Sequence, residues 1–489
     1  MRMRVLYMIA VLSVIAAIAF AQRRSNPPWF PSLMAFEHYD SVRTHLFEQA
    51  RFGGSYGGNN QVAVRRAPAQ YPTGYNIVYL SPDEIFVYGG GYGNIQNATG
   101  AFVAKVDPDT LKPIWFKQLI NTAENGEWDY PGVVSLLDDG FLYLIFGYRL
   151  AKLDPKNGTV IAQVDLPVNP PTGGPALPEN TSFNGFDALP DHTLIAKTVY
   201  REAGCTLQGP PALFSCPDPG MVPLSIMVSI DPKTLTVLDN VQLPEIVAGR
   251  PTTARFRDKN YVYLATPTTA IRYLVQNGQF TQDTSWSPGN IYQPGQAIGS
   301  AVAVMNDWFV VQSNGSPATA PLSVIVISQA DASKQFSAQP FAGFPVPSGF
   351  PTSWAPFSVS VDPSQNLIYS GDSSPGVIGA LKLTANGLQT VWTAHQRTTE
   401  FLALIGPRGR RVVVGTEIPP GQAPLSNTTD FVVWRDAHTG QELARTKQLP
   451  AMTSGAMIQP YYFGKIFYLG LEHGDLFELT VQPAPARGH

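Results

Sequence analysis

Charge and cysteine are both scarce in this sequence of 489 residues. Asp, Glu, Lys and Arg make up 14% of it, against roughly 25% in ordinary soluble domains. The 33 basic residues do not outnumber the 36 acidic ones, so the composition does not favour nucleic-acid binding. Because 44% of the residues are hydrophobic, the low charge does not indicate disorder. The chain is expected to bury a large core.

Familiar catalytic motifs are also missing. The sequence contains no H-E-x-x-H motif, and its G-x-S-x-G match at 53–57 lies in a glycine run without the strand–turn–helix context of a nucleophile elbow. The glycine runs at 53–58 and 89–93 lack the strand–turn–helix order of a phosphate-binding loop. No nucleotide site is therefore predicted.

Long apolar runs are absent after the first 20 residues. Arg2 and Arg4 precede an apolar run at 5–20, and Ala19 and Ala21 are small residues at positions −3 and −1 of a cleavage site. This pattern predicts a signal peptide over residues 1–21 and a secreted or periplasmic protein without a membrane span. An uncleaved anchor is the alternative, because the run approaches the roughly 17 residues needed to span a bilayer.

The two cysteines, Cys205 and Cys216, lie in a Gly- and Pro-rich stretch. In an exported protein such an isolated pair predicts a disulfide. Their spacing matches neither a C-x-x-C redox motif nor a zinc site.

Proline and glycine, by contrast, are abundant, at 44 and 43 residues. They punctuate a unit that recurs eight times: an apolar run, a tight polar turn and a second apolar run, as at 78–87 and 134–143. A second hairpin follows seven of these units, and in four of the seven its turn is Asn-Gly or Thr-Gly. Four strands repeating at about 54 residues predict an all-β, eight-bladed β-propeller, with a seven-bladed ring as the alternative.

The last unit lacks an outermost strand, which the segment around 61–65 is expected to supply. We therefore divide the chain into a signal peptide (1–21), an N-terminal helical segment with the ring-closing strand (22–70), a propeller (71–482) and a flexible tail (483–489). The short helix is predicted from apolar residues on one 100° arc. These residues are Phe36, Tyr39, Val42, Leu46, Phe47 and Ala50. His38 and His45 would lie on the opposite, exposed face of this helix. That the two histidines bind a metal ion is the less favoured hypothesis.

The outer hairpins resemble the repeat of the pyrroloquinoline-quinone (PQQ), or quinoprotein dehydrogenase-like, eight-bladed propellers. Residues 154–158 and 436–440 match that repeat best. The family's docking tryptophan has a counterpart in Trp115, and Trp392 lies near such a position with altered spacing. Ala162, Asp239 and Ala444 replace it elsewhere, and the family's adjacent-cysteine disulfide is missing. The resemblance implies PQQ and Ca²⁺ over the channel, with Glu127, Asp129, Asn184 and Arg250 as candidate residues.

Loop lengths predict where binding occurs. In a propeller, the loops that enter each innermost strand and those that join its second and third strands share one face. The long loops at 89–101, 200–221, 314–322 and 417–429 belong to this set, so we call their side the decorated face. Polar and aromatic residues near it are candidate ligand contacts, although solvated or paired rim residues would give the same pattern. They are Glu127, Trp128, Asp129, Asn184, Arg250, Trp354, His395 and Glu400.

These features favour an exported, non-catalytic propeller that binds a protein or glycan partner through the decorated face, with no cofactor assigned. The alternative is a PQQ-dependent quinoprotein-type oxidoreductase with Ca²⁺. A lyase or hydrolase using Glu127 and Asp129 has no specific support.

Overall fold

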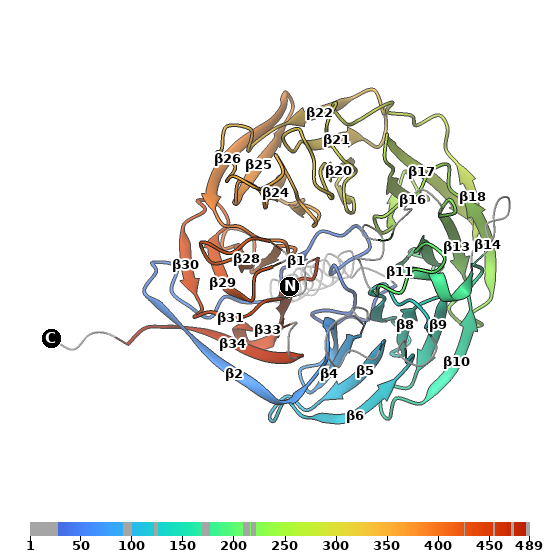
Figure 1. The fold of residues 1–489 in the computed structure, drawn as a ribbon, viewed down its shortest axis with the longest axis horizontal. Coiled ribbons are helices and arrows are strands. Elements are labelled where there is room, and N and C mark those ends of the chain that lie inside the picture. The colour runs from blue at the N-terminus through green and yellow to red at the C-terminus, as the bar shows by residue number, and fades with distance from the viewer. Residues whose placement is uncertain are drawn as a thin grey trace, which may run out of the picture.

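The computed structural model describes residues 28–90, 100–121, 126–168, 177–208, 216, 222–424, 426–452, 455–470 and 474–485. The predicted signal peptide and the end of the predicted tail lie outside these residues. Within them, eight antiparallel sheets are arranged in a closed ring (Figure 1). The prediction of an eight-bladed, all-β propeller is confirmed, and the seven-bladed alternative is wrong.

The first four blades, from innermost to outermost strand, follow the chain. Blade 1 contains β3 (Gly74–Ser81), β4 (Glu84–Gly89), β5 (Phe102–Val106) and β6 (Pro113–Gln118). Blade 2 contains β7 (Val133–Leu136), β8 (Leu142–Phe146), β9 (Arg149–Leu153) and β10 (Val160–Asp165). Blade 3 contains β11 (Thr181–Ala188), β12 (Leu194–Tyr200), β13 (Ile226–Ile230) and β14 (Val237–Gln242). Blade 4 contains β15 (Thr252–Phe256), β16 (Lys259–Ala265), β17 (Ala270–Gln276) and β18 (Gln279–Gln282).

The remaining blades complete the circle. Blade 5 contains β19 (Ala303–Met305), β20 (Trp308–Gln312), β21 (Val324–Ser328) and β22 (Gln335–Ala338). Blade 6 contains β23 (Ser360–Asp362), β24 (Leu367–Asp372), β25 (Val377–Thr384) and β26 (Gly387–His395). Blade 7 contains β27 (Ala403–Ile405), β28 (Val412–Glu417), β29 (Thr429–Asp436) and β30 (Glu442–Arg445), joined by β1 (Leu46–Phe47) and β31 (Leu449–Pro450). Blade 8 contains β32 (Gln459–Pro460), β33 (Lys465–Gly470), β34 (Asp475–Pro483) and β2 (Asn60–Gln70). Two short 3₁₀ turns, η1 (Pro178–Asn180) and η2 (Tyr462–Gly464), are the helical elements of the described residues.

Strand β2 closes the ring. It pairs antiparallel with β34, from Asn60 opposite Pro483 to Gln70 opposite Asp475. This confirms the prediction that the segment around 61–65 completes the last blade. The two ends of the propeller are thereby held in one sheet, which leaves no unpaired flank between the first and last blades.

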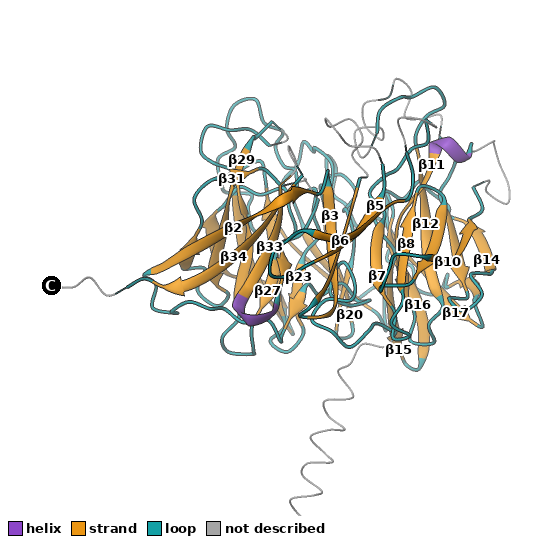
Figure 2. Ribbon diagram, turned by 90° about the horizontal axis from the view of Figure 1, so that it is seen from below, coloured by secondary structure: helices purple, strands orange, loops and turns teal. Residues whose placement is uncertain are grey.

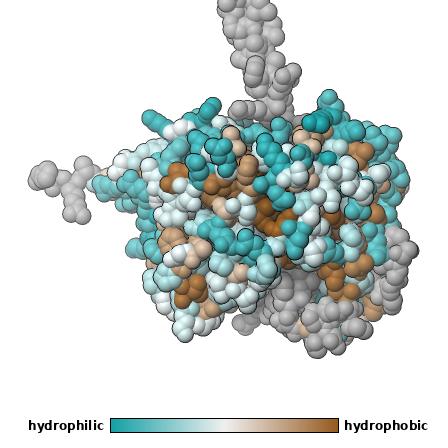
Figure 3. Space-filling model, turned by 90° about the horizontal axis from the view of Figure 1, so that it is seen from above, coloured by the Kyte–Doolittle hydropathy of each residue, from teal (hydrophilic) through white to brown (hydrophobic). Residues whose placement is uncertain are grey.

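Burial follows position within a blade. Every residue of β11, an innermost strand, is buried, whereas β10, an outermost strand, alternates between half-buried and exposed positions. The outer wall consequently mixes apolar and hydrophilic residues (Figure 3). Long loops extend from one side of the ring and short hairpin turns from the other (Figure 2). We call the side of the hairpin turns the turn face.

Three tryptophans join neighbouring blades by hydrogen bonds from the indole to a backbone carbonyl. Trp115 donates to Pro155 (3.3 Å), Trp392 to Ala437 (2.9 Å) and Trp286 to Ser328 (2.8 Å). The Trp392 ring also packs on Gly440, where a side chain would clash with the indole. Gly440 has a φ of 74°, a value that also favours glycine.

The predicted N-terminal helix does not form. Tyr39, Arg43 and His45 have φ values of 77°, 55° and 57°, which no right-handed helix contains. Residues 28–50, which we call the channel segment, instead run around the inside of the ring (Figure 1). The periodic apolar pattern misled because this segment buries its polar residues as well as its apolar ones.

Backbone hydrogen bonds fix the channel segment to innermost strands of six blades. Its carbonyls, in chain order, accept from residues of β3, β7, β15, β19, β23 and β27. The pairs, with N–O distances, are Met34–Tyr79 (2.8 Å), Ala35–Leu136 (2.8 Å), Ser41–Thr253 (3.2 Å), Val42–Val304 (2.9 Å), Thr44–Val361 (3.0 Å) and His45–Leu404 (2.8 Å). The segment thus forms an inner circle that ties the blades together.

Candidate functional site: the channel and its decorated mouth

Arg250 lies where the channel segment meets the decorated side of the ring. It precedes the innermost strand β15, and only 8% of its surface is exposed. Its guanidinium forms a buried ion pair with Glu37 of the channel segment, and donates to the Tyr75 hydroxyl (2.9 Å) and the Pro131 carbonyl (3.1 Å). Tyr75 in turn donates to the other oxygen of Glu37 (2.8 Å). The cation expected to bind an anionic ligand therefore binds a carboxylate of its own chain.

Electrostatics keep that pair charged. Burial alone would raise the pKa of Glu37, but Arg250, His38 and Arg43 hold this pKa well below its usual range. The Arg43 guanidinium lies 3.9 Å from Glu37 and donates to the Pro251 carbonyl at 2.8 and 3.0 Å.

His38 and His45 are buried, contrary to the exposure predicted for them. Their rings share a hydrogen bond of 2.6 Å, and His45 also contacts the Ser360 hydroxyl at 2.9 Å. Burial lowers the pKa of His38 to about 4 and that of His45 well below its usual value. Both imidazoles are therefore neutral at pH 7 and serve as hydrogen-bonding core residues. No group of three or more His, Cys, Asp or Glu side chains in the described ranges could hold a metal ion.

The space around this cluster is small. A cavity bounded by Glu37, Tyr75, Phe401 and Met457 has no room for a water molecule. Water is therefore excluded from this side of Glu37 and Tyr75.

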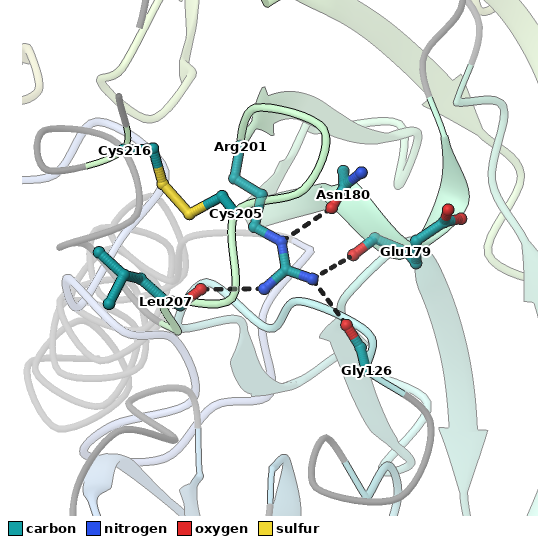
Figure 4. The surroundings of a disulfide bond; sticks show 7 residues. All are labelled: Gly126, Glu179, Asn180, Arg201, Cys205, Leu207 and Cys216. Atoms are coloured by element: carbon teal, nitrogen blue, oxygen red, sulfur yellow. Dashed lines mark hydrogen bonds between the residues drawn. A yellow bond between two sulfur atoms is a disulfide. The ribbon is translucent and has the colours of Figure 1, made fainter. Parts of the chain in front are cut away.

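Trp128 and the disulfide form a separate flap beside the mouth. The predicted Cys205–Cys216 disulfide is present. It packs with the fully buried Trp128, so this indole does not line the channel. Arg201 supports the flap by donating to four acceptors around it (Figure 4). They are Asn180 Oδ1 (2.9 Å) and the carbonyls of Leu207 (2.9 Å), Gly126 (2.6 Å) and Glu179 (3.2 Å).

Three further candidate residues differ in how their side chains are hydrogen-bonded: Glu127, Asp129 and Asn184. Glu127 accepts two hydrogen bonds from Arg149, at 2.6 and 2.8 Å, so its carboxylate is paired. Asp129 accepts from the Gly147 N–H (3.0 Å) through one oxygen, while its other buried oxygen has no partner in the described structure. Burial raises the pKa of Asp129 to about 7. Asn184 donates to the Ala248 carbonyl (2.7 Å), and its own oxygen lacks a partner within the described residues.

Trp354, His395 and Glu400 are not brought together. His395 ends β26, an outermost strand, and is exposed, so it lies on the outer part of its blade rather than beside the channel. Glu400 is buried and accepts hydrogen bonds from Thr398 (3.0 Å) and Thr399 (2.7 Å). Its pKa is raised by burial, as is that of the neighbouring Asp430, which sequence reasoning missed.

Trp354 is half-buried on the decorated side, and its backbone and the Arg397 side chain both contact Ser373; we call Trp354, Phe350 and Arg397 the rim patch. Trp354 and Arg397 both hydrogen-bond the backbone of Ser373, at 2.8 and 3.0 Å. The Arg397 guanidinium stacks over the Phe350 ring at 4.8 Å. Aromatic side chains next to an arginine are the usual composition of a binding hot spot.

Glu37 and Tyr75 are the partners of Arg250 that the sequence did not reveal. They carry no motif, and Glu37 lies in a segment mistaken for a helix. The available signal was the compact polar group at 37–41 between apolar residues, which is unusual for a link outside the ring.

Comparison with known proteins identifies the fold alone. No protein-family model and no curated protein matches the chain. The quinohemoprotein alcohol dehydrogenase of Comamonas testosteroni is similar with a TM-score of 0.59 and 11% identity, over 95% of this chain and 82% of its own. A europium-containing methanol dehydrogenase gives 0.52 and 9%, over 92% and 89%. The computationally designed Ika8 protein gives 0.50 and 10%, over 84% and 98%.

A quinone with Ca²⁺ does not fit the described channel residues. The cation of Arg250 is neutralised by Glu37, and the carboxylate of Glu127 by Arg149. The channel segment occupies the ring at the same level. The shared fold therefore does not carry the dehydrogenase chemistry to this chain.

Proposed function

We propose that this protein is an exported, non-catalytic propeller that binds a protein or glycan partner through its decorated face. The observation that carries the proposal is the ion pair between Arg250 and Glu37. A channel closed by the chain's own carboxylate leaves the long loops, rather than the ring's centre, as the surface for recognition.

Export is supported by two features. The leader predicted at 1–21 has the layout of a signal peptide. The Cys205–Cys216 disulfide suits an oxidising compartment. Within the described residues, no helix has the length and apolar character needed to cross a membrane.

The rim patch is the part of the decorated face that we expect to contact the partner. The backbone N–H of Trp354 donates to the Asp372 carboxylate (3.0 Å), which fixes its position. Because the residue is half-buried, part of it remains accessible to a partner. A rigid aromatic residue of this kind loses little conformational entropy on binding.

The proposal is tested by screening the purified protein on a glycan array and against extracts of its host's cell envelope, followed by titration of the ligand identified. Trp354→Ala is expected to weaken that binding about 30-fold, the effect of a hot-spot residue worth about 2 kcal/mol. Trp308→Ala is the matched control, because Trp308 is a half-buried tryptophan in a hairpin of the turn face. Equal losses in both variants would count against the rim patch.

The quinoprotein alternative is tested separately. The protein is incubated with PQQ and Ca²⁺, passed through a desalting column and assayed for dye-linked alcohol oxidation. Quinone absorbance that is retained together with turnover would overturn the non-catalytic proposal.

A further inference from the structure

A second cavity, with a volume of about 460 Å³, lies between blades 4 and 5. It is lined by Phe256, Arg257, Lys259, Tyr261, Arg272 and Asp283, among others, all of which belong to the described chain. Small-molecule sites commonly measure about 300–1,000 Å³. This cavity is independent of the channel and of the rim patch.

Blade 4, which borders the cavity, lacks a docking tryptophan on its outermost strand. In blade 6, Trp392 stands five residues after the turn glycine Gly387. The same position after Gly278 in blade 4 is Asp283, whose N–H donates to the Arg272 carbonyl (3.0 Å). A short carboxylate thus replaces an indole, and Trp286 makes the link to blade 5 from a different position.

The floor of the cavity is a fixed cation between two aromatic rings. The Arg272 guanidinium lies 4.5 Å from the Tyr261 ring centroid and 5.1 Å from that of Trp286. It donates to Asp283 (2.9 Å) and to the Gln329 carbonyl (2.7 Å). Asp283 therefore neutralises Arg272, and the floor adds little net charge.

The lip of the cavity is positively charged. Arg257 and Lys259 lie on either side of Asp258 at the exposed turn between β15 and β16. Asp258 pairs with Arg255 (3.1 Å), and neither Arg257 nor Lys259 has an acidic partner among the residues described. Arg257 stacks over Phe256 at 5.1 Å. The Tyr261 hydroxyl makes no hydrogen bond to another described residue, and its oxygen is not one of the buried unpaired atoms, so it is open to solvent and to a ligand.

Hydroxyl and amide side chains complete the wall. Thr281, Gln282 and Thr284 line the cavity and are exposed. They supply neutral hydrogen-bonding groups opposite the two cations. A ligand that satisfies both sets of groups carries an anionic group and several hydroxyls.

We propose that the cavity between blades 4 and 5 binds a monosaccharide-sized polyhydroxy anion, such as a sugar acid or a sugar phosphate. Arg257 and Lys259 bind its carboxylate or phosphate, and Tyr261 hydrogen-bonds a ligand oxygen. The Tyr261 ring, which lines the cavity, packs against the apolar face of the sugar ring.

The test is isothermal titration of the full chain, at low ionic strength, with glucuronate, glucose 6-phosphate and glucose. At least one of the two anions is expected to bind, and glucose at least tenfold more weakly. The two anions together distinguish a carboxylate ligand from a phosphate ligand. Absence of binding by both anions at millimolar concentration, or equal binding of glucose, overturns the proposal.

Substitutions locate the binding. Arg257→Ala with Lys259→Ala removes two exposed side chains, so folding is retained, and is expected to weaken anion binding at least tenfold. Tyr261→Phe keeps the ring and is expected to weaken binding several-fold. The matched control, Arg408→Ala with Arg410→Ala, removes two cations from another hairpin of the turn face and leaves binding unchanged. Equal losses in the two double variants would show nonspecific charge attraction and overturn the site.

Discussion

Arg250 and Glu37 are 213 positions apart in the chain and meet where little water can reach them. Sequence reasoning selected Arg250 because a polar residue just before an innermost strand faces the mouth of the ring. It could not select Glu37, because no local pattern reveals which remote carboxylate a buried cation binds.

Removing one member of the Arg250–Glu37 ion pair should destabilise the fold. Arg250→Met leaves Glu37 buried without its main cation, and we expect a loss of about 3–5 kcal/mol in the free energy of unfolding. Adding Glu37→Gln should restore part of that loss. Denaturant titration of the two single variants and the double variant measures the coupling. Additive losses would mean that the pair is not coupled.

Asp129 should make stability depend on pH. Burial raises the pKa of Asp129 to about 7. The contribution of the protonated Asp129 carboxyl to the free energy of unfolding is therefore fully present below the ordinary Asp pKa of 3.8, and it is lost as the pH rises through about 7. Asp129→Asn stays neutral and is expected to gain stability relative to the native protein between pH 5 and pH 8. Urea titrations across this range test the sign, with the exposed Asp109→Asn as control. A constant difference between the native protein and Asp129→Asn would contradict the buried, unpaired carboxyl.

At the scale of elements, repeats were the part of the structure that the sequence determined best. Each outer hairpin carries its own turn signal: Asp107 and Asp436, for example, accept from the backbone of Thr110 (2.7 Å) and Thr439 (2.9 Å). Such turns can be predicted from a few neighbouring residues, without knowledge of the rest of the fold. The channel segment carries no such signal, because its hydrogen-bond partners come from six different blades.

The docking tryptophans should matter in proportion to their burial. Trp392→Ala removes an indole that is 9% exposed, together with its hydrogen bond to Ala437, and should cost about 3–5 kcal/mol. The half-buried Trp308→Ala should cost less. Chemical denaturation of the two variants gives the comparison, and equal costs would argue against a docking role.

The disulfide should stabilise its flap locally. Replacing Cys205 and Cys216 by serine removes a constraint worth about 3 kcal/mol for a loop of this size. Because Arg201 holds the same region, we expect tryptic cleavage after Arg201 to become faster while the ring stays folded. Limited proteolysis with mass spectrometry measures this. An unchanged cleavage rate would place the flap's stability elsewhere.

At the scale of the whole molecule, the N-terminal region closes the ring twice. Strand β2 completes blade 8 on the outside, and the channel segment joins innermost strands on the inside. The proposed function accordingly uses a face of the ring, rather than its centre, for interaction. The fold is similar to that of a quinohemoprotein alcohol dehydrogenase at 11% identity, and this likeness of fold does not by itself bring that protein's chemistry to this chain.

The most direct test is a crystal structure of the mature protein after incubation with PQQ and Ca²⁺. The account predicts residues 28–50 inside the ring, Glu37 bound to Arg250, and no quinone density in the channel. Quinone bound at Arg250, with Glu37 and its neighbours displaced, would contradict it.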